Sequence, residues 1–115
     1  MTASVFCNIR ISGVHRWADA PSGSVLRNKH RHEFHIKAVA DVDHNNRDIE
    51  FIQLKQDIIS FLLSEYRSDC DGNLSDVDFG GMSCENIAEV LISKFNLSLC
   101  EVSEDGENGA IVRHQ

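Results

Sequence analysis

Residues 30–42 contain the pattern that constrains this chain most, because apolar side chains take every second position. Phe34 and Ile36 begin an alternation with charged and polar residues, and a period of two is typical of a β-strand with one buried face. Two histidines, His30 and His32, open the run. A strand places residues i and i+2 on one face, about 6.6 Å apart, so both imidazoles are expected on the same side of a sheet.

A third histidine, His15, follows an earlier alternating run at residues 5–11, which predicts a first strand. Three neutral imidazoles on a rigid sheet, with a fourth position open, make a catalytic zinc site. His15, His30 and His32 are therefore candidate zinc ligands. The opposing interpretation is that they are surface or satisfied core residues that bind no metal.

The second half of the chain predicts two helices. Apolar residues spaced three and four apart predict the first between Phe51 and Tyr66. After a polar connection at residues 69–81, Ser83 can cap the second helix, with Glu85 in its first turn.

Two further strands are predicted at residues 97–103 and 110–113, joined by a turn in which Asn108-Gly109 is the hairpin signal. The order ββααββ predicts one α+β domain over residues 1–115, a four-stranded antiparallel sheet with two helices on one face. Such a sheet leaves long edges unpaired, so we expect a homo-oligomer.

Composition narrows the class of protein. The formal net charge is −7, which argues against nucleic acid or an anionic membrane as partner. No apolar run reaches the roughly 20 residues of a membrane span, and residues 1–4 lack the features of a secretory signal. We therefore expect a cytoplasmic protein whose four cysteines are free thiols.

Five short segments carry a family resemblance: Val14-His15-Arg16, His30-Arg31-His32-Glu33-Phe34, Glu50-Phe51-Ile52-Gln53-Leu54-Lys55, Ser83-Cys84-Glu85-Asn86-Ile87-Ala88 and Val102-Ser103-Glu104. In this order they resemble the A-H-R, H-G-H-N-Y, D-F-x-x-L-K, T-x-E-N-I-A and V-x-E-T motifs of the 6-pyruvoyltetrahydropterin synthase and 6-carboxytetrahydropterin synthase family. The resemblance covers nearly the whole chain and implies that family's tunnelling fold.

The resemblance implies a set of roles. It makes His15, His30 and His32 the Zn²⁺ ligands, and it makes Glu104 the carboxylate that holds the pterin ring through the amino group and ring N–H. In the family, zinc binds the side-chain oxygens of 7,8-dihydroneopterin triphosphate and acidifies neighbouring bonds. A cysteine thiolate prepared by an Asp–His couple moves protons, and triphosphate is eliminated. The product is a pyruvoyl pterin or the carboxypterin used towards deazaguanine bases such as queuosine. The family builds this site between the subunits of a trimer or hexamer.

The chain departs from the family at the residues that move protons. Leu26 stands where the family has its catalytic cysteine, and Cys70 and Asp71 stand near the Asp–His couple. Glu33 replaces an asparagine beside the zinc, although strand alternation points it to the opposite face. Cys70, Asp71 and Glu33 are the candidate catalytic residues, and the alternative is that they are solvated residues.

Two further residues are candidates for substrate binding. Glu85 begins a helix, where the helix dipole alone explains a carboxylate, but in the family this residue approaches the pterin. Arg16 belongs to a basic group around the histidines that suits a triphosphate or is a solvated loop.

The sequence leaves three functions open. The first is a zinc-dependent lyase acting on 7,8-dihydroneopterin triphosphate, with the carboxypterin product favoured. The second is a non-catalytic protein that binds a pterin or purine and has lost the proton-transfer residues. The third is a structural domain without metal.

Overall fold

The computed structural model describes residues 2–68 and 75–114 of the chain. Within these residues, a mixed sheet has the strand order β3-β1-β2-β4-β5. The strands are β1 (Ala3–His15), β2 (His30–Val42), β3 (Val77–Asp78), β4 (Leu99–Glu104) and β5 (Asn108–Arg113). The helices are α1 (Phe51–Tyr66), α2 (Cys84–Phe95) and a single 3₁₀ turn, η1 (Val25–Arg27). None of the helices described is both long enough and apolar enough to cross a membrane.

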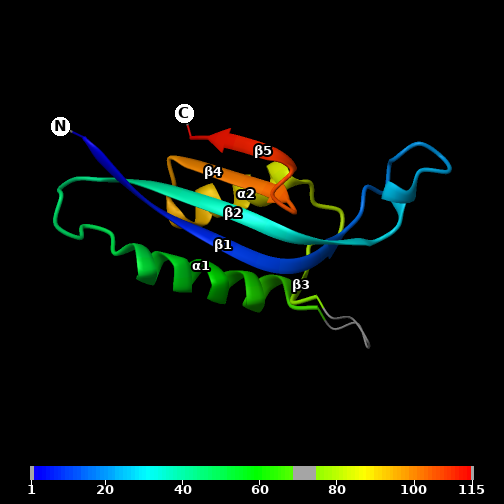
Figure 1. Ribbon diagram of the computed structural model, residues 1–115, viewed down its shortest axis with the longest axis horizontal. Coiled ribbons are helices and arrows are strands. Elements are labelled where there is room, and N and C mark those ends of the chain that lie inside the picture. The colour runs from blue at the N-terminus through cyan, green and yellow to red at the C-terminus, as the bar shows by residue number, and fades with distance from the viewer. Residues whose placement is uncertain (1, 69–74, 115) are drawn as a thin grey trace.

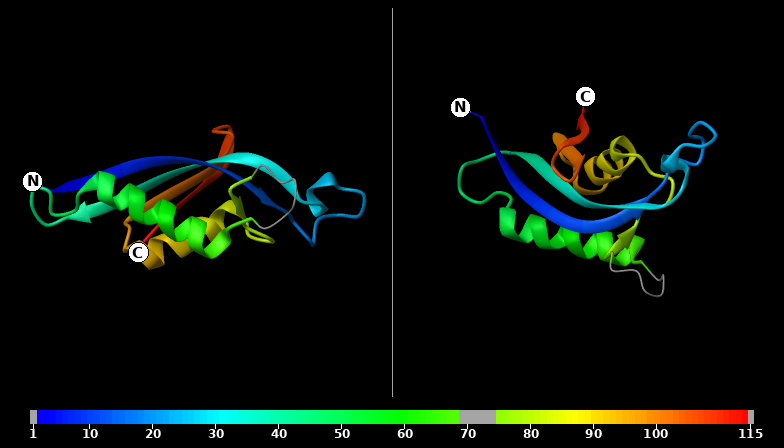
Figure 2. Two further views of the ribbon diagram at one scale, coloured as in Figure 1. Left: turned by 90° about the horizontal axis from the view of Figure 1, so that it is seen from below. Right: turned by 45° about the vertical axis from the view of Figure 1, so that its right-hand side comes forward.

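The strands β1 and β2 form a long antiparallel ribbon that gives the molecule its elongated shape (Figure 1). They pair along their whole length, from Ala3 opposite Val42 to His15 opposite His30. The molecule measures 52 × 28 × 22 Å along its principal axes. The loop between the two strands extends beyond the sheet, away from the N-terminus, in both views of Figure 2. The end of the ribbon that carries this loop also carries the histidines.

One face of the sheet carries the core. Alternate strand residues are buried there, among them Ile9, Phe34 and Val102, and they join one cluster with the buried residues of both helices. Helix α1 contacts β1 and β3, and helix α2 contacts β4 and β5. The predicted α+β class, with two helices packed on one face of a sheet, is therefore confirmed.

Local signals define where both helices begin. The side chain of Glu50 accepts hydrogen bonds from the backbone N–H groups of Ile52 and Gln53 at the start of α1. Ser83 caps α2 as predicted, and Asn86 completes a reciprocal capping box with it. The cap fixes the first turn of α2, which includes Cys84 and Glu85, against the end of β4 that carries the candidate site.

The prediction of four antiparallel strands is wrong, because β3 adds a fifth strand that runs parallel to β1. Strand β3 has only two residues and follows a polar segment, so it is too short to show the alternating pattern that predicts a strand. It approaches β1 closely at Gly13, which pairs with Val77, and a Cβ atom at Gly13 would lie 2.9 Å from Val77 Cγ2. The sheet of this single chain is open, with β3 and β5 at its edges.

The turn of the hairpin begins three residues before the predicted Asn108-Gly109 position. Asn108 and Gly109 lie inside β5, and the turn occupies residues 105–107. Asp105 and Gly106 adopt positive φ angles of 59° and 71°, and the N–H of Glu107 donates to the carbonyl oxygen of Glu104 (3.0 Å). Both φ values suit the tight turn of a two-stranded hairpin, and this turn brings the Asp105 side chain to β2.

Candidate metal centre

Three strands bring the predicted zinc ligands together. His15 is paired directly with His30, His32 lies two residues further along β2, and Glu104 pairs with Phe34 at the next position on the same face. One ligand atom from each of the three histidines and Glu104 lies within 4.8 Å of the others. The register of the sheet therefore brings together residues up to 89 positions apart. They form one possible metal site of three imidazoles and a carboxylate.

Each of the three imidazoles is oriented by a hydrogen bond from Nδ1. His15 Nδ1–H donates to the carbonyl oxygen of Met82 (2.9 Å), and His30 Nδ1–H donates to that of Asn28 (3.0 Å). His32 Nδ1–H donates to the Asp105 carboxylate (2.8 Å). All three partners accept only, so Nδ1 carries the hydrogen and Nε2 is left for a metal. Metal-binding histidines commonly donate their other ring N–H to a carbonyl or carboxylate oxygen, which fixes the tautomer and the orientation of the ring.

The Glu104 carboxylate faces two of these Nε2 atoms. Its Oε1 lies 3.1 Å from His15 Nε2, and its Oε2 lies 2.9 Å from His32 Nε2. With Nδ1 protonated, each contact brings an acceptor against an acceptor. Within the described residues, His15 Nε2 is buried without a hydrogen-bond donor. A metal ion bound between these atoms would relieve the repulsion between them.

Aromatic side chains form the floor of the site. The ring of Phe34 is fully buried, and its centroid lies 5.1 Å from that of His15 and 6.0 Å from that of His32, both edge to face. The ring of Phe79 packs edge to face against that of Phe34, with 5.0 Å between the ring centroids. The imidazoles therefore stand on a packed core, which limits the rotation that would separate their nitrogens.

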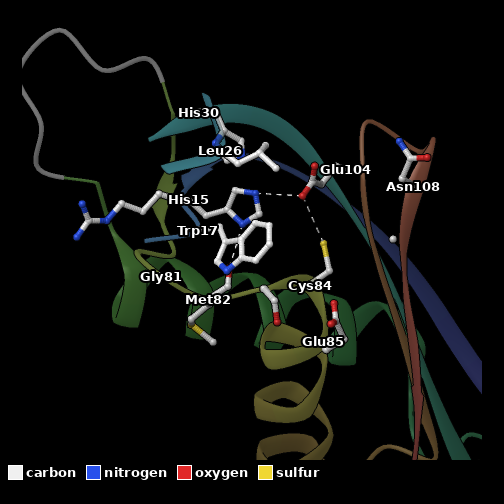
Figure 3. A pocket seen from close by; sticks show the side chains of 13 residues that line it. His15, Trp17, Leu26, His30, Gly81, Met82, Cys84, Glu85, Glu104 and Asn108 are labelled. Carbon is white, nitrogen blue, oxygen red and sulfur yellow. Dashed lines mark hydrogen bonds and ion pairs between the residues drawn. The ribbon is translucent and has the colours of Figure 1, made fainter. Parts of the chain in front are cut away.

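A cavity of about 430 Å³ opens beside the histidines (Figure 3). Its lining combines apolar side chains, among them Trp17 and Leu26, with the carboxylates of Glu85 and Glu104. The backbone N–H of Trp17 donates to the carbonyl oxygen of Leu26 (2.8 Å), which holds the two sides of the loop together. Apolar walls with a few polar groups, at this volume, are typical of a site for a small organic molecule.

Cys84 is a residue of the cavity that the sequence analysis did not select. It is the first residue of α2, and its Sγ contacts Glu104 Oε1 at 4.0 Å (Figure 3). Burial raises the pKa of this thiol to about 11, and the carboxylates of Glu104 and Glu85 add to the effect. The thiol is therefore protonated at neutral pH in the metal-free protein. Its position between Ser83 and Glu85, in a segment already assigned to the site, was the signal that pointed to it.

Of the three predicted catalytic residues, only Glu33 lies within the described residues, and it does not line the cavity. Glu33 lies on the opposite face of the strand, where its Oε1 accepts from His35 Nε2 (2.8 Å), so its side chain points away from the cavity. Cys70 and Asp71 lie outside the described residues. Both predicted substrate-binding residues besides Glu104 line the cavity: Glu85 lies in the first turn of α2, and Arg16 directly follows β1.

A scan against protein-family models and a search of curated proteins give no match for this chain.

Asp105 offers a test of whether the hydrogen bond to His32 Nδ1 supports metal binding. Its two carboxylate oxygens accept separately, Oδ1 from the Glu33 N–H (2.9 Å) and Oδ2 from His32 Nδ1, and these bonds lower the pKa of Asp105. Asp105→Asn tolerates the positive φ but supplies only one oxygen. We expect zinc affinity to fall about 10-fold, measured by competition with a chromophoric chelator. An unchanged affinity would show that His32 needs no such partner.

Proposed function

We propose that this chain is a zinc-dependent lyase acting on 7,8-dihydroneopterin triphosphate, in the manner of 6-carboxytetrahydropterin or 6-pyruvoyltetrahydropterin synthase. The observation that carries the proposal is the convergence of His15, His30 and His32, each oriented through Nδ1, beside a cavity that contains carboxylates. These are the same side chains that the family motifs supply. The tunnelling fold is part of the proposal, and the open edges β3 and β5 are where copies of the chain would join.

Zinc suits the donor set. Imidazole nitrogen and carboxylate oxygen are both common zinc ligands, and the buried Nε2 of His15 lacks any donor within the described residues. When bound, zinc supplies Lewis acidity towards the side-chain oxygens of a substrate.

The cavity suits a planar heterocycle with an attached polar chain. Glu85 and Glu104 offer carboxylates that accept from the amino group and ring N–H of a pterin. Trp17 and Leu26 would cover the ring and exclude water. Arg16 lies at the same cavity, where its charge would attract a triphosphate.

A non-catalytic protein that binds pterins or purines is the second candidate. The observation that favours it is Leu26, an apolar side chain on the cavity wall where the family's motif has its thiol. Cys84 is the thiol that lines the cavity from the other side, and its raised pKa makes it a proton donor rather than a ready base. Both candidates use the same metal and ligand groups and differ only in turnover.

We also propose a homo-oligomer, a trimer or hexamer, in the cytoplasm. A further copy could pair with the unpaired edges of the sheet. The cysteines Cys7, Cys84 and Cys100 are free thiols, which suits a reducing compartment.

Incubation of zinc-loaded protein with 7,8-dihydroneopterin triphosphate tests the proposal. We expect triphosphate to be released. Phosphate analysis measures this release, and the absorbance of the pterin reports the change in the substrate. Trp17 is the single tryptophan of the chain and lines the cavity, so binding should quench its fluorescence.

The result separates the candidates. Quenching with turnover supports the lyase, and quenching without turnover supports the binding protein. In the second case Leu26→Cys, which returns a thiol to the family's position, is the informative variant. If neither quenching nor turnover occurs with the zinc-loaded protein, both candidates are wrong.

A further inference from the structure

We infer that Glu104 is itself a ligand of the metal and completes a three-histidine, one-glutamate site when no substrate is bound. The family resemblance assigns this residue only to the pterin. The inference concerns the metal site alone, and its extension to substrate binding rests on the function proposed above.

The direction of the carboxylate supports this role. Its Oε1 lies 3.1 Å from His15 Nε2, and its Oε2 lies 2.9 Å from His32 Nε2. Ligand atoms around a tetrahedral zinc ion, with bonds of about 2.0–2.1 Å, are roughly 3.3–3.4 Å apart. The observed contacts differ from that spacing by only a few tenths of an ångström. Since one ligand atom from each of the four residues lies within 4.8 Å of the others, the carboxylate is within reach of a metal ion held by the histidines.

The balance of charge points the same way. Three neutral imidazoles and a divalent ion leave a net charge of +2 in a site where His15 is only 6% exposed. A carboxylate in the coordination sphere halves that charge. Burying an uncompensated charge is costly, so Glu104 stabilises the bound ion electrostatically as well as by coordination.

Glu104 differs from the histidines in how it is held. Each imidazole has a hydrogen bond from Nδ1 that fixes its orientation. Among the described residues, the carboxylate contacts, apart from the two imidazoles, only the Cys84 thiol, at 4.0 Å. It is therefore the ligand that can leave most easily. If the proposed function is correct, a pterin would displace Glu104 from the metal, and the freed carboxylate would accept the N–H groups of the ring while an oxygen of the substrate takes its place.

Cobalt binding to the metal-free protein tests the inference, because Co²⁺ occupies zinc sites and its visible absorption reports the number and type of ligands. We compare wild type with Glu104→Gln and with Glu85→Gln, a matched control in the same cavity and outside the possible metal group. We expect Glu104→Gln to weaken Co²⁺ and Zn²⁺ binding by about 10- to 100-fold and to change the cobalt spectrum. Glu85→Gln should leave both as in wild type.

The outcomes separate this inference from the proposed function. If Glu104→Gln binds cobalt with the affinity and spectrum of wild type, Glu104 is not a ligand, while the lyase proposal stands. If wild type shows a four-ligand spectrum that pterin leaves unaltered, Glu104 is a ligand but the proposed exchange is wrong. Absence of cobalt binding by wild type overturns the inference and the metal on which the lyase depends. Glu104→Ala, with urea unfolding of each metal-free variant, checks that a loss of affinity does not come from misfolding.

Discussion

Replacing His30 with alanine is expected to weaken zinc binding by about 100-fold or more. Structural zinc sites bind the ion with about 10–16 kcal/mol shared among four ligands, so one ligand contributes about 3 kcal/mol. At 1.4 kcal/mol per factor of ten, its removal costs about two orders of magnitude. His30 is the best choice because its side chain is partly exposed, whereas His15 is buried. Chelator competition and zinc content after dialysis measure the effect.

His44→Ala is the matched control. His44 lies in the turn after β2, and its Nε2 is 3.6 Å from an Asp48 carboxylate oxygen in an exposed pair. Such pairs contribute little to stability, so zinc affinity should equal that of wild type. If His30→Ala and His44→Ala bind zinc equally well, the three histidines do not form a metal site. The melting temperatures of the metal-free variants should be similar, because His30 packs only at the end of the ribbon.

The strand pattern made the site predictable. Alternation over residues 30–42 specified β2 to the residue, and it placed His30, His32 and Phe34 on one face. The pairing that brings His15 opposite His30 follows from two alternating runs joined by one loop. A period of two leaves little freedom in register, since a slip of one residue would turn the core face towards solvent. For this reason the histidines came together as expected.

Features that depend on contacts between distant segments were not predictable. Strand β3 exists because Val77 fits against Gly13, and two residues are too few to give a pattern. Asp105 reaches His32 because the hairpin turns three residues earlier than the Asn-Gly signal suggested. Cys84 lies at the cavity only because α2 begins beside the end of β4. In each case the feature depends on contacts between distant segments, which the pattern of a single segment does not reveal.

The hydrogen bonds that orient the three imidazoles connect the metal site to separate parts of the fold. The acceptors for the three Nδ1–H groups come from the β1–β2 loop, the segment before α2 and the β4–β5 turn. The affinity of the site for a metal should therefore depend on the positions of several separate elements. A change in the β4–β5 hairpin should alter this affinity even though no ligand is replaced.

Gly109→Ala is the sharpest test of that connection. Gly109 is exposed and pairs with Ser103, and a substitution at an ordinary exposed position changes stability by less than about 0.5 kcal/mol. Here a Cβ atom would lie 2.2 Å from the Val102 carbonyl oxygen and 2.5 Å from Ser103 Cα. Both are backbone atoms that cannot rotate away, so β5 must move from β4. We expect the free energy of unfolding of the metal-free protein to fall by about 3 kcal/mol, measured by urea denaturation.

Gly81→Ala is the control, because a Cβ atom at Gly81 meets nothing within 4 Å and should alter stability by less than about 0.5 kcal/mol. Movement of β5 would also shift Asn108, which pairs with Glu104, and the turn that carries Asp105. Zinc affinity of Gly109→Ala should therefore fall together with its stability, although no ligand is changed. A variant that loses stability but keeps the zinc affinity of wild type would mean that β2 alone positions His32, and that the hairpin contributes only to the fold.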